Sequence, residues 1–332
     1  YSIPRFPSTT QPVLYRLYVI LYTFPMDQQL LNAAQITLST CLKLQPHETL
    51  LIVDDDDSPH AVVEALYQTA KDIQSQVIRI TMTPREFNGQ ELPEAIAQAL
   101  KSVDVFLGPT SKSFSHTEAR RQASKAGVRG ATLPGVTEDM FRRLMSADYL
   151  QISQQARQLL TQINAAKSCH ITAPNGTDVT LEIAHDFEPD DGILDQPGAF
   201  GNLPAGEVMG APTNANGVII VDIMGDIITQ PTRIQVQDNH ITKIESNESG
   251  QKFQALLDKA AAKDGNRNAF QVAELGIGLN PLAQITGNVL EDEKVINTCH
   301  IAFGDNSSYP GGSNQASIHL DGVILQPLIN YF

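Results

Sequence analysis

Cysteine is scarce in this sequence, and its three cysteines, Cys41, Cys169 and Cys299, lie far apart. An odd number cannot form a complete set of disulfides, which predicts buried free thiols and a reducing, cytoplasmic environment. No C-x-x-C motif occurs, so a thiolate zinc site or a dithiol redox centre of that type is excluded.

Basic residues and long apolar runs are also in short supply. Lys and Arg number 23 against 37 Asp and Glu, which gives a net charge of −14. A chain this acidic lacks the Lys and Arg clusters that nucleic-acid phosphates select. No apolar run approaches the roughly 20 residues that a membrane helix needs. We therefore expect neither nucleic acid nor a membrane as a partner.

The first 25 residues differ in character from the rest. Residues 14–25, LYRLYVILYTFP, are apolar and rich in tyrosine, but no small-residue cleavage site follows them. The first methionine is Met26, and the sequence from there has the character of a domain start. We expect residues 1–25 to be an upstream N-terminal extension.

Residues 26–166 alternate strand-like apolar runs with helical periodicity. The predicted strands are 48–55, 75–83, 104–110 and 129–135, and the predicted helices are 58–73, 91–103, 116–127 and 137–166. Ser58 and Thr137 are expected to cap the helices that follow them. Strands separated by helices of about 10 to 15 residues indicate an α/β domain with a parallel sheet and flanking helices.

Residues 167–332 have a different pattern, which predicts a second, mainly β (α+β) domain. Asn175 and Gly176 give the strongest short hairpin signal, and Asp238 and Asn239 mark another turn. One helix, 249–265, interrupts the strands. The length of 332 residues also favours two domains.

The segment ASIHLDGVIL, residues 316–325, carries two polar residues in a predicted strand. His319 and Asp321 are two positions apart, so their side chains point to the same face. This arrangement suits a metal ion, and it equally suits a buried hydrogen bond between imidazole and carboxylate. The ten residues alone leave both interpretations open.

Three further ionisable residues lie at positions where packing alone does not require an ionisable side chain. Glu207 lies between two Gly/Pro turns in NLPAGEVMGAP, Glu274 enters an apolar stretch in AELGIGLNP, and His300 lies in an apolar strand. A solvated Glu207 and a core His300 are the ordinary alternatives, whereas a buried ionised Glu274 is costly unless paired or metal-bound. With His319 and Asp321 they form a ligand set without thiolate, which suits catalytic zinc, manganese, cobalt or iron(II).

Two other motifs favour structural roles. DDDD, residues 54–57, follows a predicted strand at the end where parallel sheets bind ligands, but four adjacent acids are more often a solvated turn. GIGLNP lacks the third glycine and the following helix of a dinucleotide fingerprint, and no phosphate-binding P-loop motif is present.

Six sequence blocks occur in the order of one known family. They are LPAGEV, AELGIGLNP, GNVLEDEKV, CHIAFGDN, a GG pair and IHLDGVI. On these blocks the chain, from about residue 28 onward, resembles the M29 family of metalloaminopeptidases, the thermophilic aminopeptidases. It is most similar to the shorter leucyl aminopeptidase-like branch.

The resemblance implies a dinuclear metal site held by Glu207, Glu274, His300, His319 and Asp321. The metals would be zinc, cobalt or manganese, and Glu274 would also act in catalysis by bridging the metals or relaying a proton. The implied activity is that of a cytoplasmic hydrolase, a metalloprotease that removes N-terminal residues from peptides with a metal-activated water. Its partners would be a peptide with a free N-terminus and a second copy in a homodimer.

Two more residues are carried over from the family. Larger members have an acid shortly before the CHIA histidine, and Glu293 is the candidate counterpart. The family also has a catalytic tyrosine after that histidine. Tyr309 lies in the corresponding loop, with a packed loop tyrosine as the alternative.

Two other functions stay open at this point. His300, His319 and Asp321 alone make a two-histidine, one-carboxylate set, as in mononuclear non-haem iron(II) enzymes. An iron-dependent ring-cleaving dioxygenase acting on dihydroxypyridine resembles the M29 fold, so this is the alternative activity. A third possibility is an inactive binding homologue of the same fold.

Overall fold

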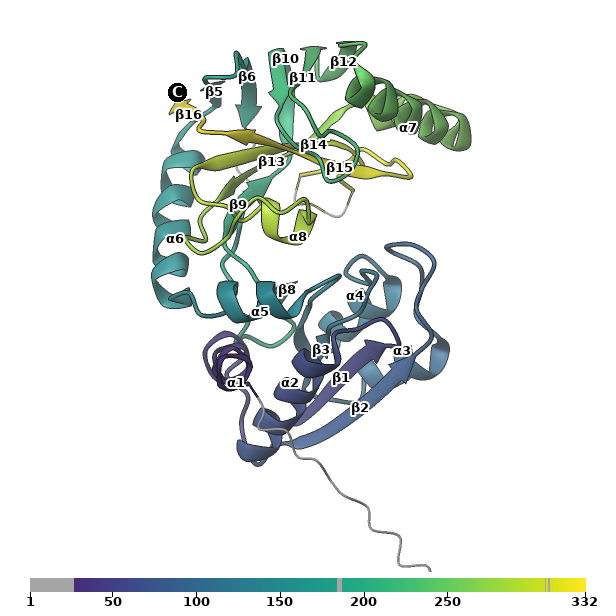
Figure 1. The fold of residues 1–332 in the computed structure, drawn as a ribbon, viewed down its shortest axis with the longest axis vertical. Helices are drawn as coiled ribbons and strands as arrows, with labels where there is room; N and C mark the ends of the chain where they lie inside the picture. Colours follow the sequence, from purple (N-terminus) through teal and green to yellow (C-terminus); the bar gives the residue numbers. More distant parts are fainter. Residues whose placement is uncertain (1–26, 184–186, 308, 310) are drawn as a thin grey trace, which may run out of the picture.

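The computed structural model describes residues 27–183, 187–307, 309 and 311–332, and the predicted extension of residues 1–25 lies outside them. The described strands form three sheets, here called A, B and C (Figure 1). Sheet A and its helices form the N-terminal half, drawn below, and sheets B and C form the C-terminal half, drawn above.

Sheet A is a parallel sheet with helices on both faces. Its order is β2-β1-β3-β4-β8, and every paired strand is parallel. Its strands are β1 Thr49–Asp55, β2 Gln76–Met82, β3 Val105–Gly108, β4 Arg129–Thr132 and β8 Phe200–Asn202. Its helices are α1 Gln28–Gln35, continued by a π-helical turn Ile36–Cys41, then α2 His60–Asp72, α3 Glu94–Leu100, α4 Glu118–Lys125 and α5 Glu138–Leu144. The α/β prediction for this region is confirmed.

The apolar run of β1 explains why helices cover both faces. Leu50 and Ile52 pack into the core that α1, α2 and α5 share. Leu51 and Val53 point the other way, into the core of α3 and α4. Side chains alternate between the faces of a strand, so a continuous apolar run needs cover on both sides.

The predicted helix 137–166 is wrong in one respect, because it is two helices. Thr137 caps α5 as expected, accepting a hydrogen bond from Met140 N. The chain then breaks, and Asp148 caps a new helix, α6 Tyr149–Ala165, by accepting from the backbone N–H groups of residues 150 and 151. A second capping carboxylate satisfies N–H groups that a continuous helix would bond internally.

Ser58 does not cap α2, in contrast to the prediction. The helix begins after Pro59, which makes no side-chain cap. The Ser58 hydroxyl instead donates to Asp55 Oδ1 at 2.9 Å and accepts from Asp55 N at 2.8 Å. Its hydrogen bonds therefore close the turn after β1, which competes with capping.

Sheets B and C are antiparallel and pack face to face. Sheet B has the order β12-β11-β10-β6-β5-β16 and sheet C the order β15-β14-β13-β9-β7. The strands of sheet B are β5 Ser168–Thr172, β6 Asp178–Ile183, β10 Pro212–Val221, β11 Thr232–Gln237, β12 His240–Ile244 and β16 Leu328–Tyr331. Those of sheet C are β7 Glu188–Asp190, β9 Glu207–Gly210, β13 Val272–Gly278, β14 Thr298–Gly304 and β15 His319–Leu325.

The predicted hairpins and helix of this half are confirmed. Residues 173–177, which include Asn175 and Gly176, connect β5 to β6. Asp238 and Asn239 connect β11 to β12, both with positive φ. The helix α7 runs from Glu248 to Asp264, and a short helix, α8, spans Val289–Asp292. Phe253 of α7 meets Phe303 of β14 edge to face, with ring centroids 5.4 Å apart.

Side chains alternate between the two faces along each strand of sheet C, and this determines which residues face the N-terminal half. Leu275, Ile301 and Ile324 join the core between sheets B and C. Their neighbours on the same strands therefore point to the opposite face of sheet C. That face is directed toward α8 and the N-terminal half (Figure 1).

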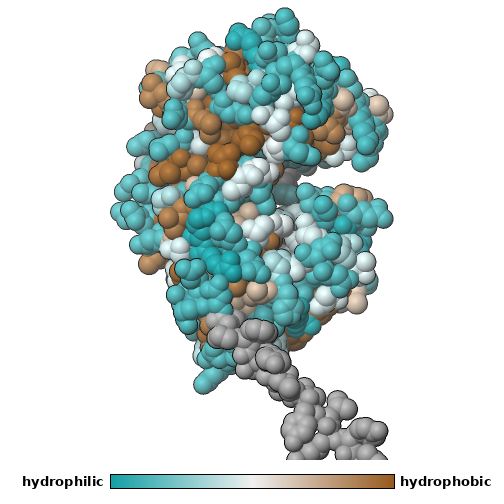
Figure 2. Space-filling model, viewed as in Figure 1, coloured by the Kyte–Doolittle hydropathy of each residue, from teal (hydrophilic) through white to brown (hydrophobic). Residues whose placement is uncertain are grey.

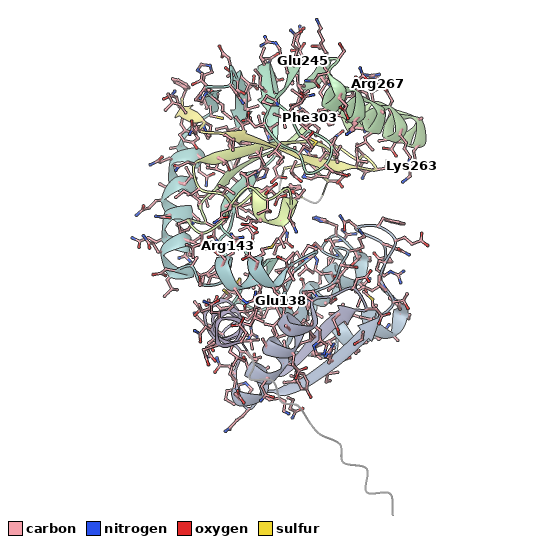
Figure 3. The ribbon with its side chains drawn as sticks, in the orientation of Figure 1. Glu138, Arg143, Glu245, Lys263, Arg267 and Phe303 are labelled. Atoms are coloured by element: carbon pink, nitrogen blue, oxygen red, sulfur yellow. The ribbon has the colours of Figure 1, made fainter. Side chains whose placement is uncertain are left out.

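The two halves are linked by more than the chain between them. Strand β8 comes from beyond residue 166 and yet pairs with β4 of sheet A. Arg143 of α5, which is labelled in Figure 3, ion-pairs with Glu291 of α8. Figure 2 shows a hollow between the halves on the right side of the view.

The predicted division into two domains at residue 166 stays a prediction. No helix in the described ranges is long and apolar enough to cross a membrane.

Candidate metal centre

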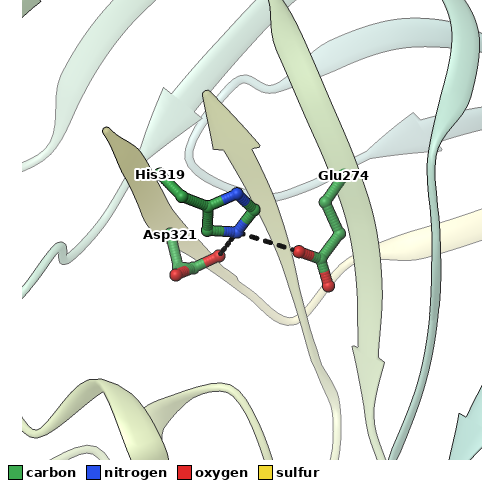
Figure 4. A group of neighbouring side chains, drawn as sticks. All are labelled: Glu274, His319 and Asp321. Atoms are coloured by element: carbon green, nitrogen blue, oxygen red, sulfur yellow. Dashed lines mark hydrogen bonds and ion pairs between the residues drawn. The ribbon is translucent and has the colours of Figure 1, made fainter. Parts of the chain in front are cut away.

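Three predicted ligands converge on the outer face of sheet C. Glu274 lies on β13, and His319 and Asp321 lie on β15. One atom of each lies within 4.8 Å of the others. His319 Nε2 lies 3.0 Å from Glu274 Oε2 and 3.1 Å from Asp321 Oδ1. Both carboxylates therefore point at one ring nitrogen (Figure 4).

The other nitrogen of His319 shows which atom is available. His319 Nδ1 lies 2.6 Å from the backbone carbonyl oxygen of Asp305. A carbonyl oxygen can only accept, so Nδ1 carries the hydrogen. In the neutral ring this leaves the lone pair on Nε2, which is the arrangement that metal-binding histidines adopt.

Two carboxylates on one nitrogen favour a cation over a simple hydrogen bond. A single Nε2–H can donate well to one of them, yet Glu274 is only 2 % exposed. Its Oε2 accepts no well-aligned hydrogen bond from a described residue, and its 3.0 Å contact is with the same Nε2 that Asp321 approaches. A buried carboxylate oxygen that must share one nitrogen is poorly satisfied, and a divalent ion would satisfy all three groups at once. The donor set of one nitrogen and two carboxylates thus fits a catalytic divalent metal.

Tyr309 lies against this group. Its hydroxyl is 3.5 Å from His319 Nε2, and its ring stacks on the imidazole with centroids 5.5 Å apart and planes 14° apart. Burial, and then the charges of Glu274 and Asp321, raise the pKa of Tyr309 well above its usual value. The hydroxyl therefore keeps its proton and can donate a hydrogen bond.

His300 lies behind Glu274. His300 Nε2 is 3.4 Å from Glu274 Oε1 and 3.6 Å from Glu207 Oε2. The predicted set of His300, His319 and Asp321 is not the one that the structure gathers, since Glu274 lies between the two histidines. Across the described residues, a single group of three metal-binding side chains is found, and His300 is outside it.

Glu207 and Glu293 instead surround a lysine that the sequence did not single out. Lys294 is 0 % exposed, and its Nζ contacts Glu207 Oε1, Glu293 Oε2 at 3.0 Å and Asp190 Oδ2 at 3.6 Å. Burial lowers the pKa of Lys294, but the charges of these three carboxyl groups outweigh it and raise the pKa well above its usual value. Lys294 is therefore an ammonium ion.

His116 was also missed. Its side chain is exposed and belongs to the segment before α4, in the N-terminal half. Desolvation, and then the charges of His319 and Arg120, lower the pKa of His116. His319 is thus the charged group with the largest effect on the pKa of His116. A lone histidine in the polar sequence TSKSFSHTE gives no local signal of such a position.

The aspartate run has a structural role in its first two members. Asp54 pairs with Arg79 at 2.7 Å. Asp55 Oδ2 accepts from the backbone N–H and the hydroxyl of Ser111, both at 2.8 Å. These bonds tie the ends of neighbouring strands together and leave both carboxylates well partnered.

Comparison with known proteins supplies a family and two related structures. Residues 29–321 match the NicX family, described as 2,5-dihydroxypyridine 5,6-dioxygenase. The 2,5-dihydroxypyridine dioxygenase of Pseudomonas putida KT2440 superposes with a TM-score of 0.76 at 17% identity, over 92% of this chain and 94% of that chain. AmpT of Thermus thermophilus gives 0.65 at 15% identity, over 92% and 95%. No curated protein sequence matches significantly.

The family match corrects the predicted activity. The chain was expected to be a hydrolase, a metalloaminopeptidase acting as a protease on peptides. The family description and the higher TM-score of the dioxygenase point to an oxidoreductase instead. The M29-like fold itself is supported, because AmpT, an M29 aminopeptidase, shares it. The six blocks that suggested a peptidase therefore identify the fold and a metal-dependent enzyme, and not the reaction.

Proposed function

The chain belongs to the NicX family of 2,5-dihydroxypyridine 5,6-dioxygenases, and on that premise we propose that it is a metal-dependent ring-cleaving dioxygenase. Its substrate would be a dihydroxylated nitrogen-containing aromatic ring. The observation that carries the proposal is the convergence of Glu274, His319 and Asp321 as a single group of three ligands.

The proposed metal is one iron(II) per chain. Glu274, His319 and Asp321 would hold it and would leave coordination positions open, and iron(II) would supply the oxygen-activating chemistry of the reaction. The donor set has one histidine and two carboxylates, in contrast to the triad of His300, His319 and Asp321 that was the alternative in the sequence analysis. Two carboxylates make the site anionic, which favours retention of a divalent cation.

The surrounding residues have separable roles. The Asp305 carbonyl fixes the orientation of His319 through Nδ1. The Tyr309 hydroxyl, 3.5 Å from His319 Nε2, can donate to an oxygen that forms on the substrate. The pKa of His116 is lowered by desolvation and then by the charges of His319 and Arg120, which makes this imidazole a candidate acceptor for the proton of a ring hydroxyl. A proton donor and a proton acceptor suit chemistry that moves a proton.

Oxygen uptake tests the proposal directly. Purified protein would be reconstituted anaerobically with iron(II) and mixed with oxygenated 2,5-dihydroxypyridine, and then with its other dihydroxy isomers. We expect oxygen consumption with loss of the ring absorbance for at least one isomer, and none for His319→Ala. Protein that holds one iron per chain and consumes no oxygen with any isomer would contradict the proposal.

Two earlier expectations remain predictions alongside it. These are a homodimer and a cytoplasmic location. The first is checked by light scattering of the purified protein, and the second by fractionation of the source cells.

A further inference from the structure

A β-bulge in β13 turns Glu274 toward the metal centre. Val272 and Glu274 pair with two consecutive residues of β14, so Ala273 between them is an extra residue on β13. Val272 and Leu275 both belong to the core between sheets B and C. In a regular strand, residues 272 and 274 would share a face, and Glu274 would point into that core. The extra residue shifts the alternation, so Glu274 points to the outer face of sheet C.

The carbonyl oxygen of this bulge accepts a hydrogen bond from a buried asparagine. Asn306 Nδ2 donates to Ala273 O at 3.1 Å, and Asn306 Oδ1 accepts from Asn314 N at 2.8 Å. A backbone carbonyl only accepts and a backbone N–H only donates, so the side-chain amide has one orientation. The carbonyl of Ala273 and the nitrogen of Glu274 belong to the same planar peptide group. Asn306 therefore holds the backbone of a metal ligand.

The backbone of Asn306 also holds the loop that carries Tyr309. Asn306 N donates to Asn314 O, and Asn306 O accepts from Tyr309 N, both at 3.0 Å. Gly312, the second glycine of the GG pair, lies against the same carbonyl, since a Cβ atom there would be 1.9 Å from Asn306 O. The loop thus closes tightly on Asn306, and the place of the Tyr309 ring depends on it.

His319 is held through the residue that precedes Asn306. Asp305 O lies 2.6 Å from His319 Nδ1, and this carbonyl shares a planar peptide group with the nitrogen of Asn306. The hydrogen bond from Asn306 N to Asn314 O therefore also fixes the direction of the carbonyl that orients the imidazole. One asparagine, only 5 % exposed, thus contacts the backbone of Glu274, the Tyr309 loop and the support of His319.

We propose that Asn306 is a positioning residue of the metal centre. Its side-chain amide keeps the bulge that turns Glu274 outward. Its backbone fixes the loop of Tyr309 and the carbonyl that orients His319. The inference rests on the proposed metal centre but does not depend on the substrate or on oxygen chemistry.

Cobalt(II) binding tests this role without any assay of turnover. Metal-free protein would be titrated with cobalt(II), whose visible spectrum reports the number and kind of its ligands. Asn306→Asp keeps the shape of the side chain but places a carboxylate oxygen against the Ala273 carbonyl, where the amide donated, so the bulge should shift. We expect a cobalt(II) affinity about 10- to 100-fold below that of the wild type, and a spectrum changed toward that of Glu274→Ala.

Asn175→Asp is the matched control. Asn175 Nδ2 donates to Ile220 O and Asn175 Oδ1 accepts from Thr177 N, both at 2.9 Å, in the turn between β5 and β6 of sheet B. The same exchange of an amide donor for an oxygen should lower the stability in urea there and keep the wild-type cobalt(II) affinity and spectrum.

Gly312→Ala is a second, independent test. The added methyl group displaces the Asn306 carbonyl and leaves the side-chain amide unaltered. This variant should also bind cobalt(II) more weakly than the wild type and with a changed spectrum.

Several results would overturn the inference. One is an Asn306→Asp protein with the cobalt(II) affinity and spectrum of the wild type. Another is an equal loss of affinity in Asn306→Asp and Asn175→Asp, because the effect would then follow stability and not position. If Asn306→Asp does not fold, Gly312→Ala decides, and wild-type cobalt(II) binding in that variant would overturn the inference.

The outcome also separates this inference from the proposed reaction. A wild type that binds cobalt(II), with the expected losses in both variants and without oxygen uptake after iron(II) is supplied, would remove the dioxygenase proposal and leave this inference standing. A wild type that binds no cobalt(II) would remove the metal centre and this inference together.

Discussion

Gly276 of β13 pairs with His300 of β14, and the His300 ring lies over the Gly276 backbone. A Cβ atom at Gly276 would be 2.0 Å from His300 Cε1 and 2.2 Å from Nε2. No side chain other than hydrogen fits there. Gly276, the first glycine of GIGLNP, is thus required because the buried His300 ring occupies the place of a side chain. A bound nucleotide is not the reason for it.

Gly276→Ala should therefore push the His300 ring away from Glu274. Overpacking of this kind costs about 1–3 kcal/mol of folding free energy. The metal affinity should also fall, because an outer partner of a ligand contributes roughly 10- to 100-fold. Urea unfolding and a metal titration measure the two effects.

The double variant Gly276→Ala/His300→Ala checks the cause. Removal of the ring removes the clash, so the double variant should lose less stability than the sum of the two single losses. Strict additivity would show that the strain arises elsewhere.

His319→Ala should abolish metal binding at the centre. It removes the nitrogen on which both carboxylates converge, so the affinity loss should exceed the roughly 10- to 100-fold of an outer partner. Elemental analysis after dialysis measures it. His240→Ala is a suitable control, because His240 is exposed on β12 and should keep its metal. Metal retained in His319→Ala would show that the ligand set is misassigned.

Tyr309→Phe should lower kcat and leave the metal content unchanged. The phenyl ring preserves the stacking on His319, while the hydroxyl 3.5 Å from Nε2 is lost. A positioned proton donor contributes typically 10²- to 10⁴-fold, so we expect a fall of about 100-fold. Steady-state oxygen uptake at saturating substrate measures it, and an unchanged kcat would leave Tyr309 as a packing residue.

The outcome at these residues shows how far the sequence could define the site. Glu274, His319 and Asp321 could be placed together because each stands out against an apolar strand, and the two-residue period fixes the face of β15. Lys294 could not be found, because a lysine within EDEK has the same local pattern whether it is solvated or buried. Its burial is decided by β7 and β9, which are distant in the sequence.

The fold, like the site, could be predicted where the sequence carries a local signal. Strong apolar runs such as β1 and turns such as Asp238–Asn239 carry local signals that packing does not override. The break between α5 and α6 was missed because the residues before Asp148 keep helical periodicity. Strand β8 was missed because Phe200, Gly201 and Asn202 have no alternation, and only their partner β4 makes them a strand.

The ion pair of Glu48 and Arg129 predicts an acid-sensitive part of the stability. Arg129 Nη1 and Nη2 each donate to a Glu48 oxygen at 2.7 Å, and the side chains are 13% and 10% exposed. Burial raises the pKa of Glu48, but the hydrogen bonds and charge of Arg129 outweigh it, so that the pKa lies below its usual value.

A lowered folded-state pKa means that the unfolded chain takes up the proton first. The contribution of Glu48 to stability is therefore complete above its unfolded pKa and is lost as the pH falls through the lower folded value. At neutral pH, Glu48→Gln should cost about 1–3 kcal/mol, and the gap to the wild type should narrow below about pH 4. Urea unfolding at several pH values measures this. A gap that widens toward acid would contradict the sign.

Strand β8 has a consequence for the order in which the protein can fold during synthesis. Gly130 of β4 pairs with Phe200, and Phe200 stacks on Phe106 of β3 with ring centroids 6.2 Å apart. Until the ribosome has added Asn202, β4 has an unpaired edge, and such edges invite association with other chains. Because distant pairings form late, the nascent N-terminal half should be the stage at which this protein most needs protection from aggregation.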